Sequence, residues 1–462
     1  AVLRTGEPGS YVADESHEKS GIDAAELLSG CGDQKEIRTL LERPLFNDVL
    51  YGMVRFRHRD VRELLAAEWF DDLLEKGHRR AVEALIFREQ YGERIITPRM
   101  RPILPWLILF DEEIRAKVLA LEPEIAMEGG DAAGLPIGER RKLLRDVIER
   151  LVSGDGSRSV SDNSAIARIA QEDLADDALK LIEKYADHDD AIFFLGRLVW
   201  QGYMKACVPA LRRIAANGER GKYARLAATR AVMTCGDAEQ KQRLWAALHD
   251  SADKLPRELL AEIIQNAAAD VATVGLLLSG LAKLPAYERF EASGLAQAMH
   301  GLIDRMAVNK NGVGGQPLLD LIAGLNDFLE SEPHMERREC RVSEDHAWLL
   351  AHASHAAERL VSAQVDGALL NDVISVMLMI PAVRFWRSGD IDEYRTKLHE
   401  LVPAWPALND KLFWASIHQA RERMETKDER LTNHHQVAWL GHYWKFGPER
   451  FDDVIGFIRD NS

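Results

Sequence analysis

The chain has 462 residues and a net charge of −15 at pH 7, with 46% hydrophobic and 29% charged residues. This balance is typical of folded globular proteins, and the acidic surplus disfavours a general binder of nucleic acid or anionic membranes. No apolar run approaches the ~18 residues of a membrane-spanning helix. We therefore expect neither nucleic acid nor a membrane among the partners.

Four cysteines are scattered at positions 31, 207, 235 and 340, and no two form a Cys-x-x-Cys pair. Isolated cysteines in a long chain are typical of a reducing compartment, and the first residues lack the basic-then-apolar layout of a signal peptide. We expect a cytoplasmic protein. Because the chain begins with alanine and ends within a helical pattern, we interpret it as a fragment of a larger protein.

Two short helices are expected between residues 23 and 41, and residues 50–58 then have two short extended runs that predict a β-hairpin. Alternation places Val54 and Phe56 on one face of the second strand and Arg55 and Arg57 on the other.

A helix is predicted directly after this hairpin. Asp60 has the position of an N-cap, and Glu63 completes the spacing of a capping box. One apolar face is expected from residues that repeat at helical spacing, namely Val61, Leu64, Leu65, Trp69 and Leu73. A hairpin that leads straight into a helix is typical of the end of a winged-helix domain.

From Gly77, a candidate helix C′ residue, the pattern is helix after helix, with almost no further strand alternation. Helices are predicted at residues 79–90, 100–109, 112–121, 138–152, 162–170, 173–186, 189–203, 205–216, 222–235, 238–250, 256–269, 272–283, 286–308, 316–331, 343–365, 370–387, 390–401, 411–424, 436–445 and 449–459. Between residues 160 and 285 helix pairs recur at roughly 30–40 residues, the period of HEAT-like repeats.

We therefore predict an all-α fold: an α-solenoid, or HEAT-like helical repeat array, with a small N-terminal winged-helix-like hairpin remnant. The predicted domains are a winged-helix-like remnant at 1–76, a helical linker domain at 77–160, a HEAT-like array at 161–310 and a C-terminal helical segment at 311–462. Loops at 309–315 and 332–341 are expected to divide the array.

Residues 56–67, which read Phe-x-His-x-x-Val-x-Glu-Leu-Leu-Ala-Ala, resemble the signature near the end of the winged-helix domain in NACHT-type STAND NTPases. These signalling ATPases include animal inflammasome receptors and bacterial anti-phage proteins. Residues 44–58 and 130–136 are similar to large bacterial members, in which a helical-repeat sensor follows the NTPase core. The resemblance implies that this chain is the regulatory and sensor portion of such a protein.

His58 is the one binding residue that we predict. The resemblance implies that its imidazole reaches the phosphates of bound ADP and holds the NTPase closed, and an imidazole N–H is a suitable phosphate donor. The alternative interpretation is a histidine that orders the hairpin-to-helix corner. The chain has no Gly-x-x-x-x-Gly-Lys-Ser/Thr loop. ATP or ADP would therefore be held by an NTPase domain upstream, and we predict no catalytic residue here.

Three other patterns have structural interpretations that we favour. Residues 106–113 mimic a Walker B strand, but Asp111 has the position of an N-cap for a helix that begins at Glu112. Arginines between residues 55 and 101 are interleaved with acidic residues, which favours ion pairs over contacts with nucleic acid. His352 and His355 could share a face, but spacing indicates no third ligand, so we predict no metal site.

Six tryptophans lie in the last third of the chain, and their helical spacing favours core packing: Trp348, Trp386, Trp405, Trp414, Trp439 and Trp444. Two of them, Trp405 and Trp444, are also candidate anchors for a partner.

The main hypothesis is thus a sensor that binds a protein trigger through its helical repeats and oligomerises on activation. The alternative is a stand-alone α-solenoid scaffold that binds a protein or peptide without any coupling to nucleotide.

Overall fold

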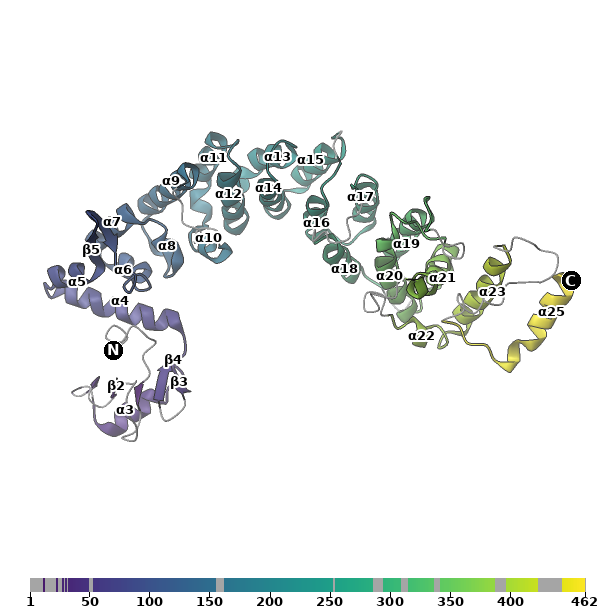
Figure 1. The fold of residues 1–462 in the computed structure, drawn as a ribbon, viewed down its shortest axis with the longest axis horizontal. Helices are drawn as coiled ribbons and strands as arrows, with labels where there is room; N and C mark the ends of the chain where they lie inside the picture. The colour runs from purple at the N-terminus through teal and green to yellow at the C-terminus, as the bar shows by residue number, and fades with distance from the viewer. Residues whose placement is uncertain are drawn as a thin grey trace. The chain divides into compact units, whose positions relative to one another are not determined.

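The computed structural model describes residues 11–12, 22–23, 27–28, 30, 32–49, 53–154, 162–251, 254–285, 294–308, 315–335, 341–386, 396–422 and 443–461. These residues are mostly helical, and the predicted all-α helical repeat array is confirmed (Figure 1). The chain divides into two compact units, Ala1–Asp237 and Ala238–Ser462. This boundary falls inside the predicted 161–310 domain, and the finer division at 76, 160 and 310 stays a prediction.

A small sheet near the N-terminus contains the predicted hairpin. Its four strands, β1 (Tyr11–Val12), β2 (Ile22–Asp23), β3 (Phe46–Val49) and β4 (Met53–Phe56), lie in the order β2-β1-β4-β3. The pair β3–β4 is antiparallel, with Phe46 opposite Phe56, and the turn between them lies outside the described residues.

Helix α3 (Gln34–Leu41) covers this sheet. Its buried Ile37 and Leu41 pack with Val54 of β4. Val54 is thus buried and Arg55 exposed, as the alternation predicted.

Helix α4 (Arg59–Glu75) does not bury the predicted apolar face. Its buried side chains are Glu63, Ala67, Phe70 and Leu74, which repeat at helical spacing and face α6 (Leu104–Phe110). Leu65 and Trp69 are exposed at 44% and 53%. The prediction failed because α4 carries apolar residues around most of its circumference, so spacing alone does not identify the core side.

The predicted helix at 79–90 ends early. Helix α5 (Arg79–Ile86) runs directly into strand β5 (Phe87–Gln90), which pairs with β6 (Glu93–Ile96). Tyr91 and Gly92 join the two strands with φ angles of 54° and 84°, the left-handed pair that a two-residue hairpin turn requires. Sequence reasoning missed this hairpin because Tyr occupies a position where Asn or Gly usually gives the signal.

The remainder of unit 1 is built from two rows of helices. Helices α10 (Asn163–Ile169), α12 (Asp189–Gly202) and α14 (Lys222–Cys235) pack in one row, and α9 (Ile137–Ser153), α11 (Ala175–Lys184) and α13 (Val208–Ala216) form the other (Figure 1). Each helix packs on the second helix after it, which is the arrangement of a helical-repeat array. Shorter helices α7 (Glu112–Leu121) and α8 (Ile125–Glu128) link this array to α6.

Unit 2 repeats the same two-row packing. One row contains α16 (Arg257–Gln265), α18 (Leu295–Arg305), α20 (Leu350–Ser362) and α22 (Leu398–Leu401), and the other contains α17 (Val271–Leu281), α19 (Gln316–Leu329), α21 (Asn371–Trp386) and α23 (Pro406–Glu422). The unit also contains α15 (Ala238–His249) and α25 (Phe451–Asn461).

The predicted helix at 343–365 begins later, with a 3-10 turn η6 (Ala347–Leu349) before α20. Within the described part of the chain, no helix has the length and apolar content needed to span a bilayer.

Candidate functional site

His58 lies at the corner between β4 and α4. It is the N-cap residue of α4, with extended backbone angles (φ −114°, ψ 130°), and its side chain makes no capping hydrogen bond. The side chain is exposed and has no hydrogen bond or ion pair with any described residue. The imidazole therefore faces solvent and is available to a partner.

Other groups order this corner. The Arg57 N–H donates to the Leu45 carbonyl at 2.8 Å, and Arg57 Nε donates to Asn47 Oδ1 at 2.8 Å. The rings of Phe46 and Phe56 pack with centroids 4.9 Å apart. The interpretation of His58 as the residue that orders the corner thus finds no side-chain contact among the described residues to support it; only its backbone carbonyl accepts a hydrogen bond, from the Arg62 N–H at 3.4 Å.

The predicted capping box at Asp60 and Glu63 is wrong. The N-cap is His58, so helix α4 begins two residues earlier than predicted and Asp60 lies within its first turn, where a carboxylate still interacts favourably with the helix dipole. Glu63 is 5% exposed and accepts a hydrogen bond from Arg59 Nε at 2.5 Å. This hydrogen bond with Glu63 raises the pKa of Arg59. Glu63 therefore pairs with Arg59 and does not take part in a capping box.

An apolar stripe starts at the same corner as His58. It consists of the half-buried Val61 and the exposed Leu65 and Trp69, whose spacing of four residues places them on one side of α4. This side lies opposite the buried Ala67 and Phe70. Exposed apolar side chains mark interaction surfaces when they are contiguous, and here they extend from a histidine whose side chain has no partner among the described residues.

Several of the arginines between residues 55 and 101 form ion pairs, as the sequence indicated. Glu63 also lies 3.7 Å from Arg62 Nη2, Arg79 pairs with Asp111, and Arg101 binds Glu128 and Glu122. The predicted salt-bridged face is confirmed at these positions, which leaves less uncompensated positive charge for phosphates of nucleic acid.

The Walker B-like segment is helical. Leu104–Phe110 forms α6, and Asp111 caps α7 by accepting a hydrogen bond from the Ile114 N–H at 2.7 Å. The predicted N-cap is confirmed, and the Asp111 carboxylate is occupied by Arg79 rather than directed at a ligand.

Three histidines gather between α18 and α20. His300 lies with its ring centroid 5.0 Å from that of His352 and 4.7 Å from that of His355. His355 Nε2 also lies 2.8 Å from Asp304 Oδ1. Spacing could not reveal His300 because it comes from another helix. Among the described residues, no group of three or more His, Cys, Asp or Glu has the geometry to hold a metal ion.

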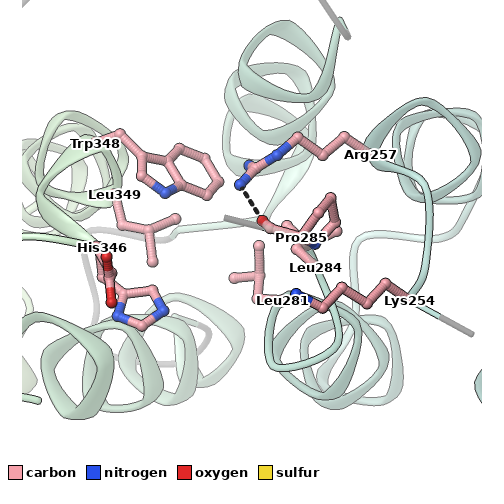
Figure 2. A pocket seen from close by; sticks show the side chains of 9 residues that line it. Lys254, Arg257, Leu281, Leu284, Pro285, His346, Trp348 and Leu349 are labelled. Carbon is pink, nitrogen blue, oxygen red and sulfur yellow. Dashed lines mark hydrogen bonds between the residues drawn. The ribbon is translucent and has the colours of Figure 1, made fainter. Parts of the chain in front are cut away.

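A pocket of about 240 Å³ lies in unit 2 between the start of α16, the end of α17 and η6. Figure 2 shows Lys254 and Arg257 entering from one side and His346, Trp348 and Leu349 from the other. Arg257 Nη2 donates to the Pro285 carbonyl at 2.9 Å, and its guanidinium lies 4.9 Å from the Trp348 ring centroid.

The pocket beside Trp348 combines charge with an apolar wall. His346 Nδ1 lies within hydrogen-bond distance of Ser331 Oγ and Ser343 Oγ. Burial lowers the pKa of His346; nearby Asp345 opposes this change and Arg257 adds to it. The neutral ring and the indole then form one wall, and Lys254 supplies a cation at the rim. Such a recess suits a side chain with an acidic or aromatic end.

Of the six tryptophans in the last third of the chain, four are half-buried: Trp348, Trp405, Trp414 and Trp444. The side chains of Trp386 and Trp439 lie outside the described part. Trp444 Nε1 donates to Ser416 Oγ at 3.1 Å, a packed position rather than a free anchor.

The chain matches no family model, no curated protein and no solved structure in the comparisons made. The candidate sites therefore rest on geometry.

Proposed function

We propose that this chain is the regulatory and sensor portion of a NACHT-like STAND signalling NTPase. The observation that carries the proposal is the solvent-facing imidazole of His58, which is placed at the end of a strand, at the start of a helix, and bonded to no described group. The family resemblance implies that this N–H donates to a phosphate of ADP, which a nucleotide-binding domain would hold.

The apolar stripe of Val61, Leu65 and Trp69, of which Leu65 and Trp69 are exposed, is the surface on which the nucleotide-binding domain would rest. An apolar stripe next to a polar anchor has the composition of an interface with a buried centre and a polar edge. Closure of the domain on this stripe would bring His58 to the phosphates. Trigger binding to the helical rows would then shift the balance towards an open, oligomerising form, in a setting such as bacterial anti-phage defence.

The test is calorimetric titration of ADP into the intact protein that carries this chain, in wild type and as His58→Ala. We expect the variant to bind ADP about tenfold more weakly, the loss of roughly one charge-assisted hydrogen bond. His78 is the matched control, because it is an exposed N-cap histidine without a capping hydrogen bond at the start of the next helix, α5. His78→Ala should bind ADP as wild type does. Equal affinities of wild type and His58→Ala would refute the role of His58.

A stand-alone scaffold is the second candidate, and the pocket beside Trp348 favours it. A recess with a cation at its rim and an indole on its wall suits an anchor side chain from a bound protein. The two functions separate in one measurement. An intact protein that binds a protein partner but no ADP or ATP is the scaffold, whereas nucleotide binding that depends on His58 supports the sensor.

A further inference from the structure

A second pocket, of about 150 Å³, lies within unit 1 between α10, α12 and α14. Its walls include Asn163, Phe193, Arg197, Trp200, Ala227 and Arg230. It is remote in the sequence from the His58 corner and belongs to one row of the repeat array. The residues around it include two arginines and no acidic side chain.

Arg197 is a buried cation without a carboxylate partner among the described residues. Its exposed fraction is 8%, and its Nε donates to the amide oxygen of Asn163 at 2.7 Å. Within the part of the chain that the structure describes, no carboxylate lies within 4.0 Å of this guanidinium. Burial lowers the pKa of Arg197, Asp162 partly offsets this change, and Arg230 adds to it.

Arg140, in the same unit, is a buried arginine that has a carboxylate partner. It is also 8% exposed, but its Nη1 and Nη2 bind the two oxygens of Asp173 at 2.8 and 2.5 Å, and its Nε donates to the Leu135 carbonyl at 3.1 Å. Burying a charge is costly unless it is paired. Compared with Arg140, Arg197 has no carboxylate in contact within the described part of the chain, and it borders a pocket that can hold an anion.

The aromatic walls keep the two guanidinium groups in place. The Arg197 guanidinium lies 4.9 Å from the Phe193 ring centroid, and that of Arg230 lies 4.4 Å from the Trp200 ring centroid. Cation–π contacts of this kind fix the plane of the guanidinium fork. The Trp200 indole N–H is buried and has no hydrogen-bond acceptor among the residues that the structure describes. The pocket therefore gathers donors from two elements around a small space.

We propose that this pocket binds a phosphate group, either as inorganic phosphate or as the monoester of a small molecule. The lining supplies two guanidinium groups and an indole from α12 and α14, and this number of donors suits the several oxygens of a tetrahedral anion better than the two coplanar oxygens of a carboxylate. The volume fits the phosphate group itself and leaves the attached group, if any, at the mouth of the pocket. This site does not depend on the nucleotide role proposed for His58.

The test is the thermal stability of the chain in sodium phosphate, with sodium chloride and sodium acetate at equal ionic strength as references. A ligand that binds the native state raises the melting temperature with concentration, so phosphate should stabilise more than either reference. Phenyl phosphate distinguishes the two sources, since a stronger effect than that of inorganic phosphate indicates a monoester and a weaker effect indicates the free ion. No phosphate-specific effect, or an equal effect of acetate, would overturn the proposal.

The decisive variant is Arg197→Gln, which should weaken phosphate binding about tenfold or more. It should also melt at the same or a higher temperature than wild type without phosphate, because an unpaired buried charge is removed. Arg145→Gln, at a half-exposed arginine of α9, is the control that should keep the full response. If Arg197→Gln does not fold, Trp200→Phe removes the indole N–H alone. A reduced response then supports the site and an unchanged one overturns it.

Discussion

The Arg79 guanidinium holds the Asp111 carboxylate with both terminal nitrogens, at 3.2 Å from Nη1 to Oδ1 and 2.6 Å from Nη2 to Oδ2. The same carboxylate caps α7 through the Ile114 N–H. One side chain therefore fixes the start of α7 and ties it to α5. Burial opposes ionisation of Asp111, but the hydrogen bonds from Arg79 and Ile114 together lower its pKa.

Replacing Asp111 should destabilise unit 1. We expect Asp111→Ala to lower the free energy of unfolding by about 2 kcal/mol, through loss of the cap and of the hydrogen bonds to a charged partner. Asp111→Asn should lose less because the amide oxygen still caps. Since the folded-state pKa is lowered, the contribution of Asp111 is present at neutral pH and is lost as the pH falls through the acidic range. Urea unfolding followed by circular dichroism would measure both variants, and equal stability of Asp111→Ala and wild type would contradict the assignment.

The two neighbouring aromatic residues of α4 should respond very differently to truncation. Phe70 is fully buried, whereas Trp69 is 53% exposed. Phe70→Ala should cost about 3–5 kcal/mol because it leaves a cavity, and Trp69→Ala should change the free energy of unfolding by less than about 0.5 kcal/mol. The comparison uses the midpoints of urea unfolding curves. A large loss at Trp69 would mean that the stripe on α4 is part of the core and not a docking surface.

Close packing of α12 on α14 depends on Gly196. A Cβ at this position would lie 2.9 Å from Ala227 Cβ and 3.0 Å from the Ala227 carbonyl carbon. Gly196→Ala should therefore destabilise unit 1 by about 1–3 kcal/mol through overpacking. Gly275 in α17 is the matched control, since a Cβ there meets nothing within 4 Å.

For Gly275→Ala we expect a gain of about 0.5–1 kcal/mol, because alanine restricts the unfolded chain and favours the helix. Differential scanning calorimetry of both variants decides the matter. Opposite signs are expected, and a stabilised Gly196→Ala protein would show that α12 and α14 have room to separate.

Unit 2 should lose stability on mild acidification because of His352. The side chain is 3% exposed, its Nδ1 has no hydrogen-bond partner within the described part of unit 2, and burial, reinforced by His300 and His355, lowers its pKa from 6.5 to about 3. Protons therefore bind more readily to the unfolded chain below pH 6.5. The stability that is complete above this value should fall by about 2 kcal/mol between pH 6.5 and pH 5.

His352→Leu replaces the titrating imidazole with an apolar side chain of similar size. We expect stability close to that of wild type at pH 7, since an unpaired buried nitrogen is lost, and a shallower loss of stability between pH 6.5 and pH 5. The measurement is the urea midpoint across this range. Identical pH profiles of the two proteins would show that His352 is not the group that titrates.

Sequence patterns predicted the helical array well because most helix starts and ends carry local signals. Helix α14 has the predicted bounds, 222–235, and Gly77 follows α4 with a φ of 86°, as expected of a C′ residue. These signals act within one turn of helix and need no knowledge of the tertiary fold.

The sites were harder to predict because they depend on distant segments. The orientation of α4 is decided by α6, which lies some 40 residues later in the sequence, and apolar residues on several sides of α4 made the spacing ambiguous. The pocket around Arg197 joins α10 to α14, and no motif connects Asn163 with Arg230. His58 was identified from a local motif, and its nucleotide role stays a prediction.

The two-row packing within each unit has a consequence for how such a chain can change over evolutionary time. Because each helix is supported by its near neighbours in sequence, a duplicated or deleted helix pair leaves the remaining interfaces of that unit almost untouched. The predominance of short-range contacts also favours rapid folding. A helical array of this kind can lengthen, shorten or exchange segments while the corner at its N-terminal end stays the same.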